Sequence, residues 1–72
     1  MTPQVMRQVW SVVENAHSQT LLQMDDNSLV HWLVKQTSTQ ALLDGHETDF
    51  LSEYIKSRLH LIRDIAYERQ YS

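Results

Sequence analysis

Residues 50–69 read FLSEYIKSRLHLIRDIAYER, and the spacing of their large side chains is the strongest structural signal in the chain. Six of these side chains follow one another at alternating steps of four and three residues. This spacing places them on one side of an α-helix, as in a coiled-coil heptad. Flanking apolar residues, Tyr54 among them, widen the apolar arc to about 180°. The sequence predicts a long helix over residues 47–69 that meets more than one partner. Its seam is Leu51, Ile55, Arg58, Ile62, Ile65 and Arg69.

Arg58 occupies the middle of this seam, where a charge is costly unless it is paired or reaches water along its stem. Three interpretations are open. Arg58 pairs with a carboxylate of a neighbouring helix, or it lies in an oligomer interface and fixes the register there, or it binds an anionic ligand. The first is the simplest.

Two further amphipathic segments precede the long helix. Residues 3–20 place valines and Trp10 on one side, with Thr2 as the expected N-cap and Pro3 at the first helical position. A second helix is expected over residues 27–43, beginning within the polar run 25–28.

The ends of the second helix carry two weaker signals. Thr37-Ser38-Thr39 are poor helix formers, so a break is possible near residues 37–39. Gly45 suits the left-handed position that follows a helix.

These elements predict an all-α fold, a small three-helix bundle with antiparallel neighbours, in a single domain over residues 1–72. The chain has one glycine and one proline, too few for the turns of a strand-rich fold. It has no cysteine, so disulfides cannot compensate for its small core. Good helix packing or self-association must therefore provide the stability.

Composition narrows the functional classes. The net charge is −3, which disfavours general nucleic-acid binding. No run approaches the ~20 apolar residues of a membrane span, and the first residues do not resemble a signal peptide. We therefore expect a cytoplasmic protein that does not enter a membrane.

Residues with catalytic or metal-binding chemistry are scattered. The four histidines lie in four different regions, and the cluster Asp44-x-His46-Glu47-x-Asp49 reads as a polar turn before an acidic helix start. No nucleophile motif or phosphate-binding glycine loop is present. His60 and Asp64 stand four residues apart and should touch, as surface pairs do. We expect no enzyme, and no catalytic, cofactor-binding or metal-binding residues.

The wide apolar arc and the small size predict a non-catalytic protein–protein interaction or adaptor module. We expect it to associate with itself through the last helix, or with another helical protein. Trp32 lies off the apolar stripe of its helix, and it either covers the edge of the core or anchors a partner. The interface candidates are Leu51, Tyr54, Ile55, Arg58, Ile62, Ile65 and Trp32.

A small regulator that binds nucleic acid through residues 56–67 is the alternative. Lys56, Arg63 and Tyr67 share a face there, but Glu47 and Glu53 precede them and would repel phosphates. Nucleic acid is therefore the less favoured partner.

Overall fold

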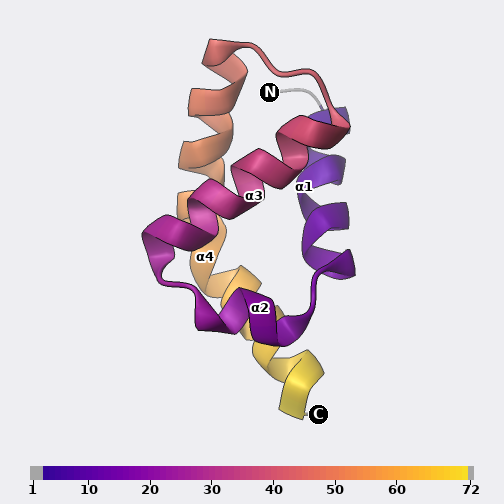
Figure 1. Cartoon of the computed structure of the whole chain (residues 1–72), viewed down its shortest axis with the longest axis vertical. Coiled ribbons are helices and arrows are strands. Elements are labelled where there is room, and N and C mark those ends of the chain that lie inside the picture. Colours follow the sequence, from indigo (N-terminus) through magenta and orange to yellow (C-terminus); the bar gives the residue numbers. More distant parts are fainter. Residues whose placement is uncertain (1–2, 72) are drawn as a thin grey trace.

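The computed structural model describes residues 3–71, and within this range the chain is helical with no strand (Figure 1). The all-α fold is thus confirmed, with four helices in place of the three that we predicted. They are α1 (Pro3–Asn15), α2 (Ser18–Gln23), α3 (Asp26–Gln40) and α4 (Gly45–Tyr71).

The helices form a small bundle in which α3 lies obliquely across α1 and α4 (Figure 1). In this view α1 and α4 both run downward, whereas α3 rises from α4 toward the upper end of α1, so that it runs opposite to each of them at an oblique angle. The short α2 crosses the lower end and packs against α4. Because α4 is the longest element, with 27 residues, its last turns extend past the other helices (Figure 1).

All four helices contribute to one hydrophobic core. Trp10, Trp32 and Leu59 are partly buried and pack against its edge. Burial of a large aliphatic side chain contributes about 1.5–3 kcal/mol, so this cluster is the main source of stability. The buried apolar residues are Val5, Val9, Val12, Val13, Leu21, Leu29, Val30, Leu33, Leu51, Ile55, Ile62 and Ala66.

The predicted first helix over residues 3–20 is wrong at its C-terminal end. The chain leaves the helix after Asn15, and His17 has an extended backbone with φ −67° and ψ 135°. No side chain caps the start of α2 there. The turn brings Leu21 into the core, where it is fully buried. The expected N-cap Thr2 lies outside the described residues.

The helix that we predicted over residues 27–43 is shorter at its end and unbroken in the middle. It begins at Asp26, behind the N-cap Asp25, and ends at Gln40. No break occurs at residues 37–39, where the hydroxyls of Ser38 and Thr39 donate to carbonyl oxygens of the same helix. Beyond it, Leu42 is fully exposed.

Gly45 does not take the left-handed position that we expected. It is the first residue of α4, and no described glycine has a positive φ. Asp44 supplies the cap, since its side chain accepts a hydrogen bond from the Glu47 N–H at 2.8 Å. The helix therefore runs over residues 45–71, slightly longer than the predicted 47–69.

Candidate interaction surface

The interface candidates of α4 divide into buried and exposed groups. Leu51, Ile55 and Ile62 are fully buried in the core of the chain itself, so they are not available to a partner. Tyr54 and Ile65 are half-buried and Arg58 is exposed. The surface available on α4 is therefore displaced from the seam that we predicted.

Two apolar residues that were not among the candidates complete this surface. Phe50 is 56% exposed and Leu61 is 46% exposed. They are three helical turns apart and point within about 20° of each other, at 100° per residue. Their exposure depends on how α4 is rotated against the bundle, which residue spacing alone did not determine. We define the α4 strip as Phe50, Tyr54, Arg58, Leu61 and Ile65.

Arg58 lies over an aromatic ring and does not enter the core. Its guanidinium carbon is 5.3 Å from the centre of the Tyr54 ring. It forms no ion pair with any described residue, so the expected intramolecular carboxylate partner is absent from this part of the chain. An exposed cation–π contact contributes about 0.5–1 kcal/mol. Arg58 therefore remains able to meet a carboxylate or an aromatic ring of a partner.

Tyr54 connects the α4 strip to α1. Its hydroxyl accepts a hydrogen bond from the Trp10 indole N–H at 3.1 Å. This bond is partly buried, and it fixes the Tyr54 ring on which Arg58 lies. The central part of the strip is consequently held in place before any partner binds.

The other two arginines of α4 are engaged within the chain. Arg63 donates to the Asp26 carboxylate at 2.8 and 3.2 Å and to the Met24 carbonyl oxygen at 2.8 Å. Arg69 donates to three carbonyl oxygens around the end of α1, at 3.0–3.1 Å. Both arginines hold helices together, a role that sequence reasoning missed because their partners are more than 35 residues away.

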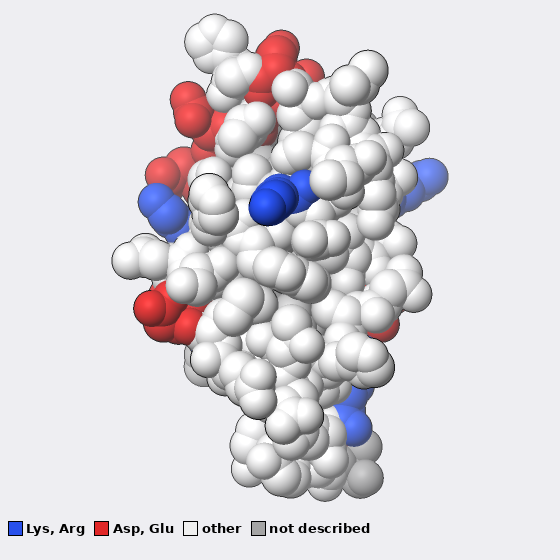
Figure 2. All heavy atoms as spheres, in the orientation of Figure 1, with Lys and Arg blue, Asp and Glu red and all other residues white. Residues whose placement is uncertain are grey.

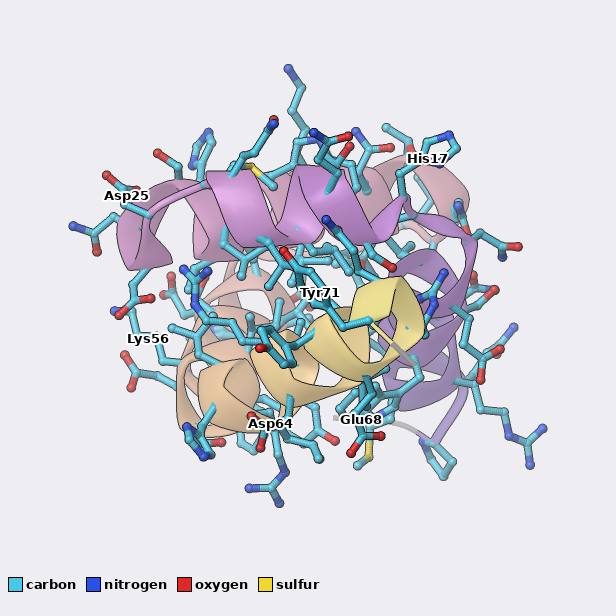
Figure 3. The ribbon with its side chains drawn as sticks, turned by 90° about the horizontal axis from the view of Figure 1, so that it is seen from below. His17, Asp25, Lys56, Asp64, Glu68 and Tyr71 are labelled. Atoms are coloured by element: carbon cyan, nitrogen blue, oxygen red, sulfur yellow. The ribbon has the colours of Figure 1, made fainter. Side chains whose placement is uncertain are left out.

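Charged pairs cover the outer side of α4. Lys56 is 3.6 Å from Glu53, and the predicted contact between His60 and Asp64 is confirmed at 3.4 Å. Carboxylates gather over the N-terminal part of α4, at the upper left of Figure 2. In Figure 3, Asp64 and Glu68 point away from α2. These exposed pairs stabilise the fold little.

Two exposed tyrosines lie on a different side of α4 from Leu61. The rings of Tyr67 and Tyr71 are 4.6 Å apart and tilted by 41°. Tyr67 is rotated by about 120° from Leu61 around the helix axis, at 100° per residue. This pair is therefore separate from the α4 strip.

Trp32 lies on α3 and lines depressions that include no residue of the α4 strip. It is half-buried against the core, as expected for a residue at the core edge. It also lines a shallow depression, together with Met24, Asn27, Ser28, His31 and Lys35. Its indole N–H has no partner among the described residues, whereas that of Trp10 is bonded to Tyr54.

Neither a metal site nor a membrane span is found in the described residues. Within residues 3–71, no group of three or more histidine or acidic side chains is placed to hold a metal ion. None of the four described helices combines the length and apolar character required to cross a bilayer. Comparisons with protein-family models, curated proteins and solved structures give no match to this chain.

Proposed function

We propose that this chain is a non-catalytic protein–protein interaction module that associates with itself through the α4 strip. The observation that carries the proposal is the exposure of Phe50 and Leu61 on one line of α4. Covering these side chains removes apolar area from water, at about 25 cal/mol per Å². The held ring of Tyr54 lies between them and adds to the surface.

A second copy of the chain fits this strip because the strip is nearly symmetric about Arg58. Phe50 and Tyr54 lie on its N-terminal side, and Leu61 and Ile65 lie on its C-terminal side. A two-fold contact requires such a self-complementary surface. With the two copies of α4 antiparallel about Arg58, Phe50 of one copy lies opposite Ile65 of the other, and Tyr54 lies opposite Leu61.

Charge also favours the antiparallel arrangement. Residues 44–53 contain four acids and no lysine or arginine, whereas residues 54–71 contain four lysines and arginines and two acids. Antiparallel helices place each acidic half beside the more basic half of the other copy, and parallel helices would place the acidic halves together. The strip is narrow, so we expect a dissociation constant on the order of micromolar.

Nucleic-acid binding through residues 56–67 is less well supported. Arg63 is engaged by Asp26 and the Met24 carbonyl oxygen, and Lys56 lies beside Glu53. A phosphate would have to displace these contacts. We expect no retention of the purified chain on heparin at physiological salt.

Light scattering over a dilution series tests self-association. We expect a mass near twice 8.5 kDa at high concentration, falling toward 8.5 kDa on dilution. Leu61→Lys should give the monomer mass at every concentration, with an unchanged circular dichroism spectrum. Tyr67→Ser is the matched control, because Tyr67 is 59% exposed on another side of α4, and it should leave the dimer intact. A monomer at all concentrations would exclude the proposal.

A further inference from the structure

The depression beside Trp32 is a second surface of the bundle. It is formed by residues between 24 and 35 and shares none with the α4 strip. We define the α3 groove by its lining residues Met24, Asn27, Ser28, His31, Trp32 and Lys35. Met24 and Trp32 supply apolar surface, and both pack against the core. A second depression adjoins it across Asn27 and His31, toward α4, and includes Lys56.

Three side chains of the α3 groove carry hydrogen-bond donors without partners. The Trp32 indole, the His31 imidazole and the Lys35 ammonium form no hydrogen bond or ion pair with any described residue. By contrast, the Trp10 indole donates to Tyr54, and Arg63 is paired with Asp26. The groove therefore collects donors that the fold itself does not use.

No carboxylate lines the α3 groove or the depression beside it. This absence is notable because the chain carries nine acids against six lysines and arginines. The two acids nearest in sequence are engaged, Asp25 with the Ser28 N–H and Asp26 with Arg63. A ligand in the groove meets positive charge and free donors next to apolar surface.

We infer that the α3 groove binds an acidic peptide segment of a partner protein. An apolar side chain of the segment packs on Met24 and Trp32, and its carboxylates accept hydrogen bonds from Lys35, His31 and the Trp32 indole. An amphipathic helix presents both features on one side. The inference does not rest on self-association, because the groove and the α4 strip have no residue in common.

Two-dimensional ¹H–¹⁵N NMR of the full chain tests this inference. The probe is a helical peptide of about 15 residues made of leucine, alanine and glutamate. The matched peptide has glutamine in place of every glutamate. We expect the acidic peptide to shift the Trp32 indole signal and the backbone signals of His31 and Lys35. The Trp10 indole, bonded to Tyr54, should stay in place and serves as the internal control.

Charge reversal separates specific binding from general attraction. Lys35→Glu should weaken binding of the acidic peptide on the order of tenfold. Arg7→Glu is the matched control, because Arg7 is exposed on α1 outside the groove, and it should change the affinity by about twofold or less.

Several results would overturn the inference. They are no shift at Trp32 up to about 1 mM peptide, equal affinity in Lys35→Glu, or equal binding of the glutamine peptide. Stronger shifts of the same signals by a single-stranded oligothymidylate would assign the groove to phosphate instead. None of these results affects the light-scattering test, since Leu61→Lys leaves the groove intact.

Discussion

Arg69 on α4 closes the C-terminal end of α1, with its Nη1 atom donating to the Val13 carbonyl oxygen at 3.0 Å. Its Nη2 atom donates to the carbonyl oxygens of Glu14 and Ala16, each at 3.1 Å. The last carbonyl groups of a helix have no partner within the helix, and they carry partial negative charge. One guanidinium therefore stabilises the point where the chain turns from α1 into α2.

Replacing Arg69 with glutamine should destabilise the fold. We expect the free energy of unfolding to fall by about 1–2 kcal/mol, because three carbonyl oxygens lose a charged donor. Urea unfolding followed by circular dichroism measures the change. Arg58→Gln is the control, and it should cost about 0.5 kcal/mol or less, because Arg58 makes only an exposed ring contact. Equal losses in both variants would contradict the capping role.

Thr37→Val should stabilise the chain. Thr37 is fully buried, and its hydroxyl oxygen has no hydrogen-bond partner. Removing the hydroxyl at nearly constant shape relieves its desolvation cost, so the free energy of unfolding should rise by about 1 kcal/mol. The control is Thr39→Val, because the exposed Thr39 hydroxyl donates to the Gln36 carbonyl oxygen. A lower stability of Thr37→Val would show that the hydroxyl is bonded.

Asp25 should make stability depend on acid pH. The Ser28 backbone N–H and hydroxyl, and more weakly Arg63, hold the pKa of the Asp25 carboxyl below its ordinary value. The folded state then binds fewer protons than the unfolded state at this group. The contribution of Asp25 to the free energy of unfolding is present above the pKa of the unfolded state. It is lost as the pH falls through the pKa of the folded state, from about pH 4 downward.

Asp25→Asn isolates this contribution. Urea unfolding at a series of pH values should show the variant less stable than the parent chain at pH 7, and the difference should shrink below about pH 4. Asp49→Asn, at an exposed position that caps no helix, is the control. A loss of stability in Asp25→Asn that is the same at all pH values would show that it does not come from the charge of Asp25.

The long helix was predictable because its apolar residues repeat over more than five turns. Two further signals were local and correct: α3 begins within the polar run 25–28, and His60 contacts Asp64. Each depends on residues within four positions of each other, where helix geometry alone determines the contact. The all-α fold followed from these patterns and from the scarcity of glycine and proline.

The position of Arg58 was not predictable from a heptad. The buried line of α4 continues from Ile55 through the half-buried Leu59 to Ile62, and Arg58 lies to one side of it. A straight helix drifts by about 20° per heptad from a strict seven-residue repeat. The drift, with the cost of burying a charge, turns Arg58 toward water and exposes Phe50 and Leu61.

The break between α1 and α2 was missed because nothing local marks it. Residues 15–18, Asn-Ala-His-Ser, contain no glycine or proline, and His17 provides no side-chain cap. The turn is stabilised by Arg69 and by the burial of Leu21, both of which depend on tertiary structure. Residue spacing carries no signal for a cap that comes from 53 positions away.

The long-range polar contacts of the described chain all join α4 to residues 10–26, with separations of 37–56 positions. The ribosome synthesises the chain from its N-terminus, so α1 emerges well before Arg69, which caps it. Contacts between such distant positions also slow folding, because a long loop must close before they form. During synthesis α1 can pack against α3 first, but the turn from α1 into α2 lacks its arginine cap until the end of α4 emerges, and in that interval a protease can reach this turn.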